Sequence, residues 1–222
     1  MKTIKFLGLP LLIFFYMILS VPFQSCEPDD NCEDETECDT CNVLRKPNIY
    51  IYPNENIQLT VKLHFLLGGE IVKSIPEYGN GWNVLVDTSG LINSTYSFLF
   101  YESTQPDIWQ RNYGWIIKTD KLESFFRQNM TDYGFNGREI DDFIAYWIPR
   151  LNSYPLYSIY PQTKTIIDDV IQLEFSKQPE NILRLFYVIK GHNQLQDKLT
   201  VPTIDSFKRE GYFVTEWGGI LK

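Results

Sequence analysis

The feature that most constrains the fold is a change of hydrophobic period along the chain. Residues 58–65 alternate apolar and polar side chains, which is the period of a strand with one buried face. His64 falls on the polar side of this strand, so we expect it to be exposed. The apolar side consists of Leu59, Val61, Leu63 and Phe65.

Similar short segments surround this strand and are separated by turn residues. We expect strands at 48–53, 71–75, 82–87 and 96–101. Short turns join neighbouring strands in antiparallel pairs. This part of the chain therefore predicts an antiparallel sheet or a small sandwich.

A helical period replaces the alternation after residue 119. Asp120, with Glu123 three residues later, is typical of a helix start. A second helix is expected over residues 138–151, where Pro149 ends or bends it. Because a short loop separates the two helices, they predict a helical hairpin. Strands return at 156–160, 170–175, 182–189 and 212–217.

These patterns predict an α+β fold: an antiparallel, strand-rich, sandwich-like N-terminal part, a helical hairpin and further strands. With 44% hydrophobic and 15% aromatic residues, the chain can bury a core and is not expected to be disordered. We assign residues 45–222 to a single α+β domain, with 45–118 and 119–222 as possible sub-parts.

The first 25 residues differ from this body in composition. Lys2 and Lys5 precede a long apolar run, and Ser25 is a small residue at its end, which is typical of a secretory signal peptide. A retained membrane anchor is the alternative, but the run is short and contains Pro10. We therefore predict that residues 1–25 are a signal peptide.

An acidic segment follows the leader. We assign residues 26–44 to an acidic, cysteine-containing tether, because 26–41 hold eight acidic residues and no base. Like charges repel and extend such a linker. The net charge of −8 therefore belongs mainly to this segment. The nearly neutral remainder lacks the basic surface that a nucleic-acid partner requires, so no nucleic-acid binding is expected.

The four cysteines all lie in the tether, at Cys26, Cys32, Cys38 and Cys41. Cys26 follows Ser25 as the lipidated cysteine follows a small residue in a bacterial lipobox, which it resembles. Lipidation there would anchor the chain to a membrane. It would leave three cysteines for disulfide bonding in an unknown pairing. Two disulfides are the alternative if Cys26 is free, and a zinc site is a third reading.

Several segments together resemble an uncharacterised family of bacterial exported proteins and lipoproteins. The likeness runs from about residue 46 to the C-terminus. Members open with a strand of lysine, proline, a hydrophobic residue, tyrosine, a hydrophobic residue, tyrosine and proline, and this chain has Lys46 to Pro53 (KPNIYIYP). The other matching segments are 76–82, 98–102, 139–151 and 211–219. The resemblance implies an exported protein and assigns no activity.

Four carboxylates are the candidates for catalysis, because glycoside hydrolases use a pair of carboxyl groups, one of them in an apolar setting. Each lies beside an aromatic residue or one helical turn from one. They are Glu77, Glu102, Asp142 and Glu216. The simpler interpretation is that Glu102 and Glu216 end strands, while Asp142 faces solvent or pairs with Arg138. The chain has no nucleophile elbow, zinc-protease motif or nucleotide loop.

The most distinctive loop spans residues 76–82 (PEYGNGW). Its glycines allow a tight turn. Tyr78 and Trp82 are candidates for a rim that stacks on a sugar or anchors a protein. The simpler interpretation is a hairpin whose Trp82 starts the next strand inside the core.

We therefore expect an exported, lipid-anchored envelope protein that acts as a binding module. The alternative is a carboxylate-dependent hydrolase of glycans. We expect it at the outer membrane or cell surface, or alternatively secreted. The partners would be the membrane, through Cys26, and an extracytoplasmic protein or glycan. We expect no cofactor and no metal.

Overall fold

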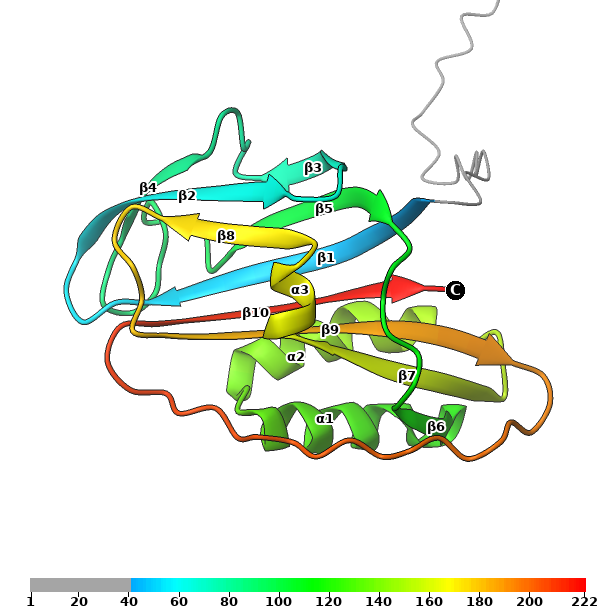
Figure 1. The fold of residues 1–222 in the computed structure, drawn as a ribbon. Coiled ribbons are helices and arrows are strands. Elements are labelled where there is room, and N and C mark those ends of the chain that lie inside the picture. Colours follow the sequence, from blue (N-terminus) through cyan, green and yellow to red (C-terminus); the bar gives the residue numbers. More distant parts are fainter. Residues whose placement is uncertain (1–40) are drawn as a thin grey trace, which may run out of the picture. The chain divides into compact units, whose positions relative to one another are not determined.

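The computed structural model describes residues 41–222, which belong to one compact unit (Figure 1). The predicted signal peptide, the lipidation of Cys26 and the bonding of Cys32 and Cys38 lie outside the described residues. Cys41 is the first residue of strand β1. The α+β class is confirmed, because ten strands combine with a helical pair and a short third helix.

A seven-stranded sheet forms the centre of the unit, in the order β3-β5-β1-β10-β9-β7-β6. All neighbouring pairs are antiparallel except β9 and β10, which run parallel. The strands in that order are Glu70–Ile75, Leu99–Pro106, Cys41–Tyr52, Phe213–Leu221, Asn181–His192, Leu156–Thr163 and Trp115–Lys118.

A three-stranded antiparallel sheet has the order β4-β2-β8 and packs on one face of the seven-stranded sheet. Its strands are β4 Trp82–Val86, β2 Ile57–Phe65 and β8 Ile171–Phe175. Strand β2 alternates as the sequence predicts, and its buried side chains join those of the larger sheet in one apolar core. The short helix α3 (Lys164–Asp168) connects β7 to β8 beside this core.

Helices α1 (Leu122–Tyr133) and α2 (Gly137–Trp147) cover the other face of the seven-stranded sheet (Figure 1). Their apolar stripes meet the sheet in a second core, which confirms the predicted helical hairpin. Gly134 ends α1 with φ 107°, a left-handed conformation that favours glycine. Short 3-10 turns precede α1 (η1, Thr119–Lys121) and follow α2 (η2, Ile148–Arg150).

The helix start predicted at Asp120 is wrong. Asp120 lies within η1, and no side chain caps α1. The capping box belongs instead to α2, where the Asn136 side chain bonds the backbone of Glu139 and the Glu139 side chain bonds that of Asn136. The register of both helices follows their buried stripes, so the apolar period located the helices although the cap was misplaced.

The predicted tether boundary at residue 44 is also wrong. Strand β1 begins at Cys41, and Leu44 is 0% exposed. Residues 41–44 pair with the end of β5, so backbone hydrogen bonding draws them into the sheet. The five N-terminal strands were expected in one sheet or sandwich, but both sheets combine strands from 45–118 with strands from 119–222. These two sub-parts therefore share their sheets.

A 20-residue connection, 193–212, joins the parallel strands β9 and β10 without a helix or strand of its own. It crosses the helical side of the sheet, beneath α1 and β6 in Figure 1. Arg209 fixes it there, because its guanidinium binds both carboxylate oxygens of Glu139 at 2.9 and 3.0 Å. Tyr52 and Thr215 also donate hydrogen bonds to Glu139, at 2.7 and 2.8 Å.

Candidate functional site

The opening motif of the domain interrupts strand β1. Lys46 has φ 57°, a left-handed conformation that is uncommon for a residue with a side chain. The pairing of β1 with both neighbouring strands shifts at the same place, so Lys46 and Pro47 form a bulge. Pro47 explains the interruption, because proline offers no N–H to the ladder. Bulges re-aim side chains and are frequent beside functional sites.

The Lys46 side chain lies against aromatic rings. Its Nζ is 4.4 Å from the ring centre of Phe100, 5.1 Å from that of Phe98 and 6.0 Å from that of Tyr146. These distances are in the range of cation–π attraction. Burial lowers the pKa of the Lys46 ammonium below its ordinary value.

Two of the four predicted carboxylates lie within electrostatic reach of this amine. Asp142 of α2 and Glu102 of β5 both act on Lys46 electrostatically and oppose the effect of burial on its pKa. The Tyr50 hydroxyl donates a hydrogen bond of 2.8 Å to Asp142 Oδ2, which holds that carboxylate toward the sheet. The simpler interpretation was that Asp142 faces solvent or pairs with Arg138; the structure instead gives it a hydrogen bond from Tyr50.

Further cations surround the same place. The Arg150 guanidinium lies 3.9 Å from the ring centre of Tyr146, and its Nη1 donates a hydrogen bond to the Tyr146 carbonyl at 2.6 Å. Arg150 and Lys73 both lower the pKa of Lys46, so they lie near enough to repel its charge. We name the whole set the Lys46 cluster: Lys46, Lys73, Phe98, Phe100, Glu102, Asp142, Tyr146 and Arg150.

The Lys46 cluster is chemically an amine, a guanidinium, a second lysine and two carboxylates around aromatic rings. Its three cations outnumber its two carboxylates, so the cluster carries a local excess of positive charge. Local excess positive charge attracts anionic groups. The cluster can therefore bind an acidic ligand, and it also holds a carboxylate pair that acid–base chemistry would need.

Glu216 lies elsewhere, on the opposite face of the same sheet. It is 0% exposed and accepts hydrogen bonds from the Tyr101 hydroxyl at 2.8 Å and from Arg184 Nε at 2.5 Å. Tyr101 belongs to the core between the two sheets. Glu216 is therefore a buried ion-pair partner, and it does not share a site with Glu102 or Asp142.

The loop that was predicted as an aromatic rim packs inward instead. Trp82 is 1% exposed, and its Nε1 donates a hydrogen bond to the Pro76 carbonyl at 2.8 Å. The rings of Tyr78 and Trp82 meet edge to face at 4.9 Å, and the Tyr78 hydroxyl accepts a hydrogen bond from the Leu63 amide at 2.7 Å. A ring buried in this way cannot stack on a ligand, so the prediction of a binding role for Trp82 is wrong. Glu77 is exposed on the same loop, apart from the other carboxylates.

The two histidines contact different partners, one pair exposed and the other partly buried. His64 is exposed, as predicted, and its Nε2 lies 2.6 Å from Glu174 Oε2 across the β2–β8 pair. His192 Nε2 lies 2.9 Å from the Ser158 hydroxyl. Burial, followed by the charge of Lys190, lowers the pKa of His192. Neither histidine reaches the Lys46 cluster by a hydrogen bond among the described residues.

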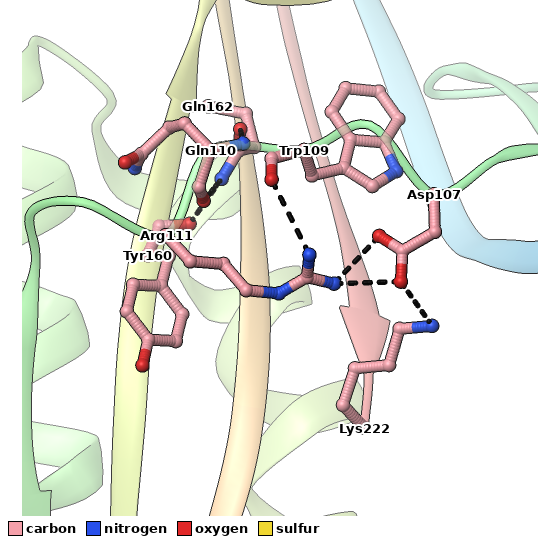
Figure 2. Close-up of polar contacts among 7 residues, drawn as sticks. All are labelled: Asp107, Trp109, Gln110, Arg111, Tyr160, Gln162 and Lys222. Atoms are coloured by element: carbon pink, nitrogen blue, oxygen red, sulfur yellow. Dashed lines mark hydrogen bonds and ion pairs between the residues drawn. The ribbon is translucent and has the colours of Figure 1, made fainter.

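A further polar cluster fastens the loop between β5 and β6 (Figure 2). Arg111 Nη2 contacts both carboxylate oxygens of Asp107, at 2.6 and 2.8 Å, and the C-terminal Lys222 contacts the same carboxylate at 3.0 Å. The side chain of Gln162 bonds the backbone of Gln110 as donor and as acceptor. These contacts join the loop to β7 and to the end of β10, so we assign the cluster a structural role.

Sequence reasoning found Glu102 and Asp142 but missed the groups around them. Lys46 was noticed only as part of a motif, and Arg150 only as part of a helix. One available signal was the lysine–proline step, because proline has no N–H for the strand ladder and occurs in sheets mainly at edges, strand starts and bulges. Lys46, Glu102 and Asp142 lie near one another only because β1, β5 and α2 pack together. No local sequence pattern encodes that packing.

Within residues 41–222, no group of three or more His, Cys, Asp or Glu side chains is arranged to hold a metal ion. The helices of this part of the chain include none with the length and apolar character needed to span a membrane. Comparisons with protein-family models, curated proteins and solved structures find no match.

Proposed function

We propose that the chain is an exported, lipid-anchored envelope protein whose domain binds an acidic ligand at the Lys46 cluster. The observation that carries this proposal is the position of Lys46. Its backbone is held in a left-handed bulge and its amine lies over aromatic rings, next to two further cations. A site that maintains an unfavourable backbone conformation is a candidate for function.

The ligand class follows from charge and from the partners available outside the cell. An acidic glycan offers carboxylates to Lys46 and Arg150, and its sugar rings offer apolar faces to aromatic side chains. Glu102 and Asp142 limit the excess positive charge and would select where on the cluster a carboxylate binds. The proposed partner is therefore a uronic-acid-containing glycan of the cell envelope or its surroundings.

A binding experiment tests this assignment with the full chain. A fluorescently labelled oligogalacturonate is the acidic probe, and a neutral dextran oligomer of equal length is its control. We expect Lys46→Asn to weaken oligogalacturonate binding at least tenfold, because asparagine tolerates the left-handed conformation but removes the cation. Lys177→Asn is the matched control, because Lys177 lies on the surface with Glu55. Equal affinity of the two variants would refute the site.

The anchor requires a separate measurement. Mass spectrometry of the mature protein should find cleavage before Cys26 and an acyl-modified N-terminus. Cleavage at another position without an acyl group would refute lipidation, and it would leave the binding assignment intact. The two parts of the proposal can therefore fail independently.

The electrostatic action of both Glu102 and Asp142 on one amine also favours a second candidate function, carboxylate-dependent hydrolysis of a glycan. An assay for new reducing ends on the same oligogalacturonate separates the two functions. An enzyme should lose activity in both Glu102→Gln and Asp142→Asn. A binding module should release no reducing ends in any variant, including the unmodified chain.

A further inference from the structure

Strand β3 forms an open edge of the seven-stranded sheet (Figure 1). Among the described residues it pairs with β5 alone. The edges formed by β4 and β6 are different, because other segments bind them. Asn93 bonds both backbone groups of Leu85 on β4, at 2.8 and 2.9 Å, and Thr200 accepts a hydrogen bond from the Gly114 amide at the start of β6, at 2.9 Å. An edge without such cover can pair with a further strand.

The open edge carries large apolar side chains in water. Val72 and Ile75 of β3 are 52% and 45% exposed, and Leu66 and Leu67 in the turn before β3 are exposed to a similar extent. A lysine and a bulge protect many sheet edges, and β3 has both, because its pairing shifts between Ile71 and Lys73. Protection alone does not explain the exposed apolar side chains, which are typical of a surface that a partner covers.

The bulge places the two charged residues of β3 on one face of the sheet. Glu70 lies opposite Thr104 of β5, and Lys73 lies opposite Glu102. Thr104 and Glu102 are two residues apart in one strand, so they share a face, and residues directly opposite them share it too. Glu70 and Lys73 therefore lie on the same face, although three positions separate them in the sequence.

This arrangement makes the edge complementary to itself. Two copies of β3 can run antiparallel about a two-fold axis with Glu70 of each copy opposite Lys73 of the other. Ile71 of each copy then lies opposite Val72 of the other, so apolar side chains also meet. A shift of one residue sets Glu70 opposite Ser74 or Val72 and removes both ion pairs. Charge therefore selects one register, and a second copy of this chain supplies it.

We propose that β3 is a dimerisation edge, at which a second copy of the chain adds its own β3 in antiparallel orientation and makes the two seven-stranded sheets continuous. Backbone hydrogen bonds supply affinity in this mode, and side-chain pairs supply specificity. The dimer should be weak and reversible, because a strand of six residues gives a small interface.

The proposed dimer has a consequence for the Lys46 cluster. Directly opposite residues share a face, so the helical faces of both copies lie on the same side of the continuous sheet. Lys73 belongs to the Lys46 cluster, and the dimer therefore presents two such clusters on one surface. A glycan with several carboxylates can bind both, which strengthens its binding. This consequence rests on the proposed function, whereas the dimer itself does not.

Sedimentation equilibrium of the full chain tests the dimer without any glycan. The chain is held in a density-matched detergent, so that bound detergent adds nothing to the measured mass. We expect the mass to rise from that of one chain toward that of two between about 10 μM and 1 mM protein. A single-chain mass at every concentration would overturn the proposal and would favour another occupant of the edge, such as residues 26–40 of the same chain.

Charge reversal tests the register. Glu70→Lys and Lys73→Glu each place like charges opposite each other twice, so each should weaken the dimer at least about tenfold. The double variant Glu70→Lys/Lys73→Glu exchanges the charges and should restore the affinity to within about threefold of the unmodified chain. Lys177→Glu is the matched control, because Lys177 lies on the surface with Glu55, and it should dimerise like the unmodified chain.

The single variants also protect the test from a folding defect. Lys73→Glu places a second acid opposite Glu102, whereas Glu70→Lys faces the neutral Thr104, so the second variant keeps the test valid if the first unfolds. Unchanged affinity in Glu70→Lys would overturn the proposed edge. A double variant that dimerises no better than Glu70→Lys would overturn the antiparallel register.

Discussion

Two charged clusters on opposite faces of the seven-stranded sheet differ in how their charges are paired. On the face toward the smaller sheet, Arg184 and Glu216 are almost completely buried and bind each other directly. On the helical face, Lys46 is only partly buried and lies over aromatic rings, with Glu102 and Asp142 near it. Both arrangements combine a cation with carboxylates, but only the buried one joins them by direct ion-pair contacts among the described residues.

This difference predicts that the buried cluster contributes mainly to stability and the Lys46 cluster mainly to ligand binding. A buried charge must be paired, so losing its partner is expected to destabilise the fold strongly. A partly solvated charge is screened and contributes little to stability. It remains accessible to a ligand. The comparison therefore predicts that variants on the inner face change folding, whereas variants in the Lys46 cluster change binding.

The largest effect should come from Glu216→Gln. The variant removes the negative charge that Arg184 Nε contacts, and it leaves a cation buried in the core. We expect a loss of about 3–5 kcal/mol in the free energy of unfolding, measured by urea denaturation. A loss below about 1 kcal/mol would contradict the difference between the two clusters, because ordinary surface ion pairs contribute no more than that to stability.

A smaller loss is expected from Glu139→Gln on the helical face. Glu139 is buried like Glu216, although it shares a face with Lys46. The variant weakens the bonds from Arg209, which fixes the connection 193–212. Charged hydrogen bonds predict a loss of about 2–3 kcal/mol in the same assay. Limited proteolysis should show earlier cleavage within 193–212. An unchanged cleavage pattern would show that Arg209 does not hold this segment.

The bulge at Lys46 gives a sharper test through two substitutions. At an ordinary strand position, alanine is more stable than glycine. At a left-handed φ of 57° the order should reverse, because only glycine adopts this conformation without strain. We expect Lys46→Gly to be more stable than Lys46→Ala by about 1 kcal/mol in thermal unfolding. The opposite order would contradict the left-handed bulge.

The smallest effect concerns alkaline pH. Burial, and then the charge of Glu139, raises the pKa of Tyr52 to about 12. The unfolded chain therefore loses this proton first as the pH rises above 10, so stability should fall between pH 10 and 12. Because Tyr52 is only partly buried and solvent screens its charge, Tyr52→Phe should remove less than about 1 kcal/mol of that fall in total. If the free energy of unfolding fell equally with pH in Tyr52→Phe and in the unmodified chain, Tyr52 would not contribute to the fall. Tyr212→Phe should change the slope in the same direction, because burial also raises the pKa of Tyr212.

The sequence alone determined the elements that have a strong period. The alternation around Val61 and the helical stripe of Ile140, Phe143 and Trp147 each report which side chains face a core, and the structure confirms both. Local chemistry was less informative. Asp120 resembled a cap but lies in a 3-10 turn, because a side chain caps a helix only where the backbone turns correctly.

Only the tertiary structure decided which strands share a sheet and which charges meet. Strand β2 and strand β8 are neighbours although more than 100 residues separate them, and Glu216 meets Arg184 across β9 and β10. The hydrophobic period of a segment shows which of its own side chains are buried. The order of the strands depends instead on contacts between segments that are distant in the sequence. For this reason the sequence predicted an α+β domain and four candidate carboxylates, and the fold alone brought Glu102 and Asp142 to Lys46 and placed Glu216 in the core.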